Sequence, residues 1–371
     1  MDTQAKRTRY GWLDVMKLIA IWLMYCSHYD GMGRFGMIGM YSVLGILFFA
    51  SGFTAFTREG MPLGPFVKEK LLRLMVPYFA FGVGTLAVRV FLLELSLGDI
   101  IAWMRGLLWG SRNVCPLAAM WFLPCLLCMS VYYHVLQRLL CRPALVLAAS
   151  AAVSLAVKLI HEGPVLPWGL DMGGRFLIYY ALGDAVSRLW RRHAAAGRSL
   201  SRPAKAALAL GVTASIYILY VNFYYGLNYF PSLLGVAQPP FIVSALITFL
   251  YQCSAAVCAA CAGLVLQKVP LLCRMGRSTL VLCGTEQLVK VILPMLAAAL
   301  GLAMPDSGSQ VGGAVMALQA GVMIAAAFAA FAMPIEKYFP WVLGRFGKAP
   351  ALKPAPVLPP EQGAGEAGPD A

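Results

Sequence analysis

The chain has 371 residues, of which 60% are hydrophobic and only 12% are charged. A soluble domain averages about 25% charged residues, so this composition excludes an ordinary globular protein and predicts an all-α integral membrane protein. The formal charge of +14 is explained below by where the basic residues stand along the chain.

The first apolar stretch, residues 12–30, contains several ionisable side chains. Asp14, Lys17 and His28 lie inside it, and Asp30 ends it. Ionisable groups are costly in hydrocarbon and therefore indicate function. A helix rises about 1.5 Å per residue, so Lys17 and His28 lie about 16 Å apart and cannot touch. We interpret them as two positions on one transmembrane path. The embedded charges argue against a cleaved signal peptide.

Further apolar stretches follow, and each approaches the roughly 20 residues that cross a bilayer as a helix. Charged residues interrupt the third, sixth and ninth, whereas runs such as 37–57 and 240–266 contain none. We predict about ten transmembrane helices in one bundle. The predicted spans are residues 12–30, 37–57, 74–94, 116–137, 143–160, 174–190, 206–226, 240–266, 279–303 and 311–334.

Most of the 30 basic residues follow even-numbered spans or precede the first span. The positive-inside rule makes that side cytoplasmic, with both termini inside, the 188–205 loop inside and the 227–239 segment outside. The net positive charge therefore mostly reflects the orientation of the chain in the membrane, and it requires no nucleic-acid partner. The expected location is a bacterial cytoplasmic (inner) membrane, with the lipid bilayer as the surrounding partner. The oligomeric state is open.

Two cysteine pairs, Cys125/Cys128 and Cys258/Cys261, have a spacing typical of metal ligands. Both lie in apolar helical stretches without a nearby histidine, so we interpret them as packing residues and expect no metal site. Residues 1–347 are predicted to form one membrane domain. Residues 348–371 are rich in Pro, Ala, Gly and Glu and are predicted to be a disordered cytoplasmic tail.

His28 leads to the first hypothesis about function. With the N-terminus inside, it lies about 25 Å along the first span, close to the outer face of a core about 30 Å thick. A neutral imidazole there can take a proton from a hydroxyl that arrives from outside. The alternative is an interfacial histidine that only forms a hydrogen bond to a neighbouring helix.

Several motifs in order resemble the acyltransferase-3 family of integral membrane O-acyltransferases. The family has a basic residue ten residues ahead of a catalytic histidine, here Lys17 and His28. An element with two phenylalanines shortly ahead of Ser-Gly-Phe follows, here Phe48-Phe49-Ala50-Ser51-Gly52-Phe53, and then a basic pair and a proline, here Lys70, Arg73 and Pro77. The segments Trp121–Pro124 and Leu166–Asp171 resemble landmarks of the family, the latter of fucose-4-O-acetylase-like members.

The resemblance implies that acetyl-CoA, the acyl donor, binds from the cytoplasm with its phosphates against Lys70 and Arg73, assisted by Lys68. His28 would deprotonate a hydroxyl of an extracytoplasmic glycan or other acceptor, and Lys17 would steer the pantetheine arm or pair with Asp14. From the residues alone, the Asp14–Lys17 pair can equally be structural, and the cations Lys68, Lys70 and Arg73 can equally follow the positive-inside rule. The resemblance leaves open which acyl group is transferred and which acceptor receives it. It also leaves open whether transfer is direct or passes through an acyl-histidine intermediate.

Two positions depart from the family pattern. Lys70 stands where the family has an arginine. The positive charge is kept, but the planar guanidinium that binds a phosphate through two hydrogen bonds is lost. Glu286 lies in a segment where many members have a histidine. We favour an i,i+4 ion pair between Glu286 and Lys290, and the alternative places Glu286 in the acceptor path.

Asp171 and Arg175, near the outer end of the sixth span, are the other candidates for binding the acceptor. The competing function is a multi-pass secondary transporter or flippase, which also needs many helices and buried charges, but the chain lacks evident inverted repeats. A membrane-bound O-acyltransferase of the lipid-modifying type is a further alternative, although its histidine belongs to a late span.

Overall fold

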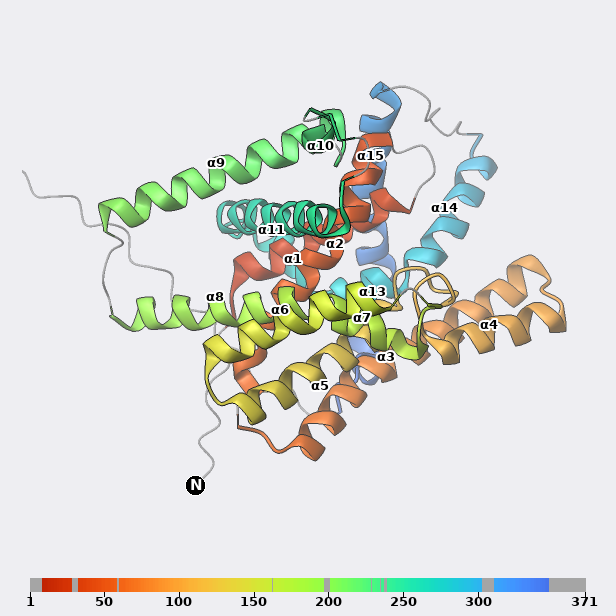
Figure 1. Cartoon of the computed structure of the whole chain (residues 1–371). Helices are drawn as coiled ribbons and strands as arrows, with labels where there is room; N and C mark the ends of the chain where they lie inside the picture. The colour runs from red at the N-terminus through yellow and green to blue at the C-terminus, as the bar shows by residue number, and fades with distance from the viewer. Residues whose placement is uncertain are drawn as a thin grey trace, which may run out of the picture.

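The computed structural model describes residues 9–28, 33–58, 60–161, 163–196, 201–227, 229–233, 235–236, 239–301 and 310–346. The elements in this part of the chain are helices (Figure 1). The predicted tail, residues 348–371, lies outside the described residues. The α-helices are α1 (Gly11–Ser27), α2 (Gly33–Phe53), α3 (Leu63–Leu93), α4 (Leu97–Trp109), α5 (Phe122–Leu140), α6 (Pro143–Ile160), α7 (Leu170–Arg175), α8 (Leu177–Ala196), α9 (Arg202–Tyr225), α10 (Tyr229–Leu233), α11 (Phe241–Leu266), α12 (Pro270–Arg277), α13 (Thr279–Gly284), α14 (Glu286–Ala299), α15 (Gln310–Ala327) and α16 (Met333–Tyr338).

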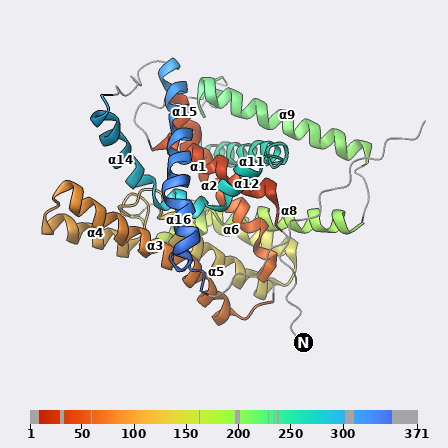
Figure 2. The same cartoon turned by 180° about the vertical axis from the view of Figure 1, so that it is seen from behind.

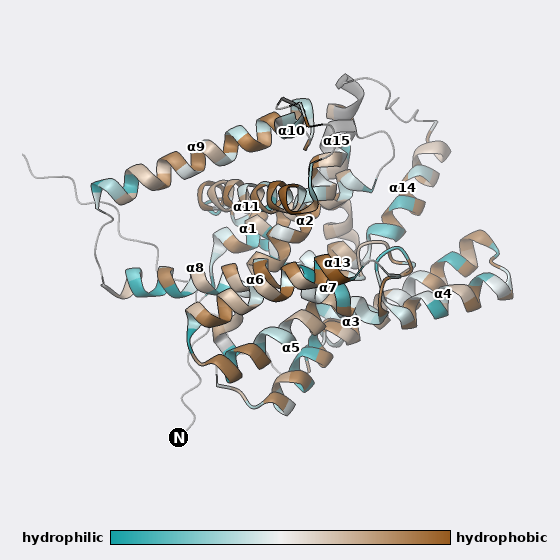
Figure 3. Cartoon of the chain, viewed as in Figure 1, coloured by the Kyte–Doolittle hydropathy of each residue, from teal (hydrophilic) through white to brown (hydrophobic). Residues whose placement is uncertain are grey.

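Seven helical segments of the described chain are long and apolar enough to cross a membrane. They are Gly36–Phe53 in α2, the helices α3, α5, α6, α9 and α11, and Ala317–Tyr338 across α15 and α16. Hydrophobic residues dominate α9 and α11 along most of their length, and hydrophilic residues gather where α8 ends and α9 begins (Figure 3). The chain is therefore a multi-pass, all-α membrane protein. The count of about ten spans and the cytoplasmic termini stay predictions.

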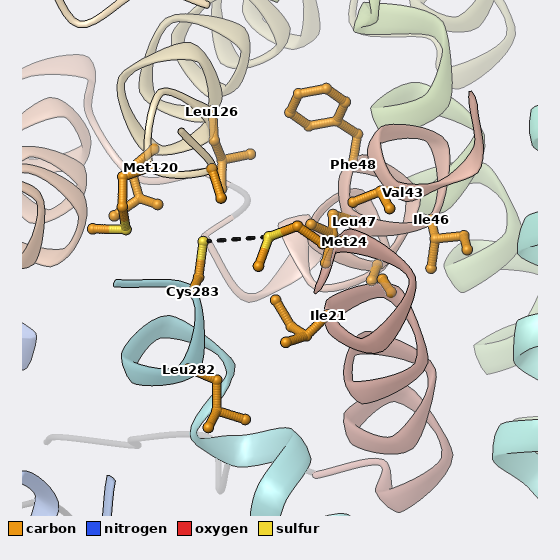
Figure 4. Close-up of a cluster of buried hydrophobic side chains, with 14 of the residues drawn as sticks. Ile21, Met24, Val43, Ile46, Leu47, Phe48, Met120, Leu126, Leu282 and Cys283 are labelled. Atoms are coloured by element: carbon orange, nitrogen blue, oxygen red, sulfur yellow. Dashed lines mark hydrogen bonds between the residues drawn. The ribbon is translucent and has the colours of Figure 1, made fainter. Parts of the chain in front are cut away.

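α1 and α2 form the centre of the bundle (Figures 1 and 2). They pack along each other, α11 and α12 contact α1, and α8 contacts α2. Figure 4 shows apolar side chains of α1, α2, α5 and α13 in one cluster, with Met24 and Cys283 in sulfur contact at 3.9 Å. The buried face of α1 thus contacts elements that are distant in the sequence.

Two spans begin more than five residues away from their predicted start. The third begins at Leu63 rather than 74, because the charged residues around Lys70 lie on the first turns of α3 rather than in a loop. The fourth begins at Phe122 rather than 116. Before it stands α4, which was not predicted and which starts with a reciprocal capping box between Ser96 and Asp99.

The sixth, ninth and tenth predicted spans are not single regular helices. Phe176 separates α7 from α8, and Thr285 separates α13 from α14. The tenth contains a π-helical segment, Phe328–Ala332, between α15 and α16. Hydropathy sums over such interruptions and therefore does not reveal them.

Candidate active site

His28 and Glu286 meet although 258 residues separate them in the sequence. The Nδ1 atom of His28 lies 3.0 Å from Oε1 of Glu286. His28 stands directly after the last residue of α1, and Glu286 is the first residue of α14. The carboxylate is fully buried, whereas 27% of the histidine side chain is exposed. The exposed imidazole is thus held by an enclosed acid.

The break between α13 and α14 brings this acid to the end of α1. The hydroxyl of Tyr25 on α1 donates to the carbonyl of Leu282 at 2.9 Å, just ahead of the break. Thr285 donates its hydroxyl to the carbonyl of Val281, one turn earlier. The carbonyl of Leu282 thus has a side-chain partner from α1 beside the break. Tyr25 is three residues before His28, so the same helix contacts the break and presents the histidine.

Lys290 compensates the buried charge. Its Nζ atom lies 2.8 Å from Oε1 of Glu286 and donates to the backbone carbonyl of His28 at 2.7 Å. Gln287 donates to the second carboxylate oxygen, Oε2, at 2.9 Å. The i,i+4 pair expected from the sequence is present. It is one part of a network that also contains His28.

This arrangement fixes the tautomer of His28. An ionised carboxylate only accepts hydrogen bonds, so the ring proton of the neutral imidazole belongs on Nδ1. The lone pair then lies on Nε2, which can accept a proton from a hydroxyl. An imidazolium formed there would be stabilised by the adjacent carboxylate. A carboxylate–histidine pair of this kind is suited to general acid–base catalysis.

The opposite end of α1 carries a basic cluster around one acid. The carboxylate of Asp14 is buried and lies 2.8 Å from Arg9, 3.2 Å from Lys17 and 3.9 Å from Arg277. Three cations thus surround one anion, and all three side chains are partly exposed. The Asp14–Lys17 contact belongs to a cluster with an excess of positive charge.

The three cations expected to bind the donor have different surroundings at the start of α3. Arg73 pairs with Glu69 at 3.1 Å, and Glu69 also pairs with Arg58. The Nζ atom of Lys70 lies 5.5 Å from the ring centre of Phe66. Lys68 is exposed. The structure thus places these three cations on one helical segment, where Arg73 is already paired with an acid.

Asp171 and Arg175 both contact His161 in a separate cluster. Asp171 is buried, accepts from the backbone of Leu166 at 3.2 Å, and lies 3.6 Å from Nε2 of His161. Arg175 donates to the carbonyl of His161 at 3.4 Å. These contacts connect the end of α6 with α7. A role in binding the acceptor stays a prediction.

Sequence reasoning missed several residues of the two clusters. The partnership of His28 with Glu286 was not predicted, and neither were the contacts of Arg9 and Arg277 with Asp14. An acid and a lysine at i,i+4 spacing in an apolar segment were the available signal for Glu286. The described residues contain no group of three or more His, Cys, Asp or Glu that could hold a metal ion.

Comparison with known protein families identifies the chain's relationship. A family model described as an acyltransferase domain, Acyl_transf_3, matches residues 10–281. The matched region contains both Asp14 and His28 and ends shortly before Glu286. No curated protein and no solved structure matches the chain.

Proposed function

Because the chain belongs to the acyltransferase-3 family, we propose that it is an O-acyltransferase that carries an acyl group, acetyl in the first instance, from cytoplasmic acyl-CoA to an extracytoplasmic hydroxyl. The acceptor class is a glycan or another hydroxyl compound at the outer face of a bacterial inner membrane. The contact between His28 and the buried Glu286 is the observation that carries the proposal.

The proposed reaction uses Nε2 of His28 as general base. It takes the proton of the acceptor hydroxyl while the hydroxyl oxygen attacks the thioester carbonyl. The tetrahedral intermediate then expels the CoA thiolate, which takes the proton back from Nε2 and leaves as the thiol. Glu286 stabilises the imidazolium between these steps and holds the ring in one orientation.

The charge distribution supports entry of the donor from the cytoplasm. We place its phosphates beside Lys70 and Arg73, where cationic side chains suit anions. In the predicted topology, the basic cluster of Arg9, Lys17 and Arg277 adds positive charge at the same side of the membrane. His28 is about 16 Å farther along α1 than Lys17, so the pantetheine arm must extend through the bundle.

The donor and acid–base roles are separated by two variants. Replacing Lys70 and Arg73 with Gln is expected to weaken acetyl-CoA binding about ten-fold or more, because a hydrogen bond to a charged group contributes roughly 1.5–3 kcal/mol. His28→Ala is expected to abolish transfer and to leave acetyl-CoA binding intact, since a general base acts in the transition state. Binding is measured by thermal shift of the detergent-solubilised protein.

Transfer is measured by mass spectrometry of surface glycans after each variant is returned to a deletion strain, and by CoA release with cell-envelope extract as acceptor. Arg202→Gln with Lys205→Gln is the control, because it removes two cations at the start of α9 without touching either site. Full transfer by a folded His28→Ala protein would refute the mechanism.

A secondary transporter or flippase is the second candidate function. The observation in its favour is the broken helix at Thr285, which places Glu286 and Lys290 inside the bundle, since interrupted helices with buried charges are typical of transporters. CoA release that depends on His28 separates the two, because a transporter has no reason to cleave a thioester.

A further inference from the structure

An apolar groove runs along the outside of α3. Its volume is about 570 Å³, and its walls include Leu72, Val76, Phe79 and Val83 of α3 together with Trp341. Trp341 belongs to the short helical turn Pro340–Leu343, which packs on α3 near Leu72. Half of the surface of Val83 and of Trp341 is exposed. The groove therefore opens outward from the bundle.

The length of the groove matches one leaflet of a bilayer. Its lining on α3 extends from Leu71 to Val83. At 1.5 Å per residue this is about 18 Å, and half of a hydrocarbon core about 30 Å thick is about 15 Å. The groove begins beside the basic start of α3, the side that the charge distribution makes cytoplasmic. The length of the groove therefore matches that of one acyl chain in the inner leaflet.

Positive charge flanks the start of the groove. Lys68 precedes Leu72 by four residues and therefore shares its face of α3, and it is exposed. Arg345, two residues after the turn that carries Trp341, is exposed as well. Tyr338, Trp341 and Phe346 are large exposed aromatic residues of the same segment, which is typical of a membrane interface.

We propose that this groove binds an anionic phospholipid of the inner leaflet. One acyl chain lies along α3 from Leu71 to Val83 beneath Trp341, and the phosphate and its anionic headgroup lie between Lys68 and Arg345. A groove that is apolar over one leaflet and cationic at its aqueous end has the polarity of such a lipid. This assignment gives Lys68 a role apart from Lys70, whose charged end lies over Phe66.

The test is native mass spectrometry of the purified full-length protein with equal amounts of phosphatidylglycerol and phosphatidylcholine of the same chain length. The wild-type protein is expected to retain phosphatidylglycerol preferentially. The variant Lys68→Gln with Arg345→Gln should lose that preference by about five-fold for each cation removed, since a cation near an anionic surface has about that effect. Arg202→Gln with Lys205→Gln removes the same charge from α9 and should keep the preference.

A second variant tests the apolar part. Ala80 lines the groove, so Ala80→Phe should fill it and reduce retention of both lipids, whereas Ala207→Phe on the exposed surface of α9 should not. Equal retention of the two lipids by the wild type, or equal losses in the α3 and α9 variants, would overturn the proposal. A dimer that Ala80→Phe disrupts would also overturn it by assigning the groove to a second copy. None of these measurements depends on transferase activity.

Discussion

Glu286 combines complete burial with contacts to three side chains. It accepts from Lys290 and Gln287 and contacts Nδ1 of His28, so neither carboxylate oxygen is left without a partner. A buried charge is tolerated only when it is paired and hydrogen-bonded. These contacts serve two purposes. Lys290 balances the charge of the carboxylate, and the carboxylate gives Nδ1 of His28 a hydrogen-bond acceptor in a fixed position. Mutation of the acid alone would therefore mix a loss of stability with a loss of activity.

A pair of variants separates these purposes. Glu286→Gln is expected to lower transfer by about 100-fold or more, because an amide can present either oxygen or nitrogen to Nδ1 and does not stabilise the imidazolium. It should also lower stability, since Lys290 loses its counter-charge. Glu286→Gln combined with Lys290→Gln should recover much of the thermal stability and remain inactive. Transfer and thermal midpoint are measured for both proteins.

The double variant distinguishes the two interpretations of Glu286. If the acid served only to neutralise Lys290, removing both charges together would restore transfer to near the wild-type rate. Such recovery would contradict the role assigned to the contact between His28 and Glu286.

At the scale of elements, hydropathy predicts the helices whose charged residues lie at or beyond their ends. The predicted spans 143–160, 206–226 and 240–266 correspond closely to α6, α9 and α11. It fails at α3, whose first turns are charged. It also fails at Thr285, where the hydroxyl of Tyr25 that contacts Leu282 beside the break is brought there only by the folded chain.

The crossing of α2 and α8 gives a prediction about packing. A Cβ atom built on Gly52 would lie under 3.0 Å from the carbonyl oxygen of Tyr180, and one on Gly183 under 3.0 Å from that of Phe49. Each Gly→Ala change should therefore push the two backbones apart and destabilise the protein by about 1–3 kcal/mol. The thermal midpoint in detergent measures the effect.

Gly84 of α3 provides the matched control for these two changes. A Cβ atom there meets nothing within 4 Å, so Gly84→Ala should be neutral or stabilise the protein by about 0.5–1 kcal/mol through helix propensity. Equal losses at all three glycines would indicate a general intolerance of alanine rather than a close helix crossing.

At the scale of the whole molecule, the sequence indicates which ionisable residues of the first span matter but not which residues pair with them. His28 and Lys17 stand out because ionisable groups in a membrane span are costly. Glu286 contacts His28 at one end of α1, and Arg9 and Arg277 contact Asp14 at the other. Long-range contacts between α1 and the α12–α14 segment bring Glu286 and Arg277 there. From a single sequence, the energetic cost of each charge in a membrane span can be recognised separately. The ion pairs that compensate this cost depend on the fold.

The proposed direction of transfer requires a defined orientation in the membrane, and α9 offers the test. Its 24 residues extend about 36 Å, enough to cross a core about 30 Å thick. Ser201, just before α9, should face the cytoplasm, and Ser232 in α10 should face outward. With Cys141→Ser removing the exposed native thiol, Ser232→Cys should react with an impermeant maleimide in intact cells and Ser201→Cys only after permeabilisation. The reverse pattern would place the basic clusters outside, away from cytoplasmic acyl-CoA. The donor would then have to reach His28 from the opposite face, which contradicts the proposed path along α1.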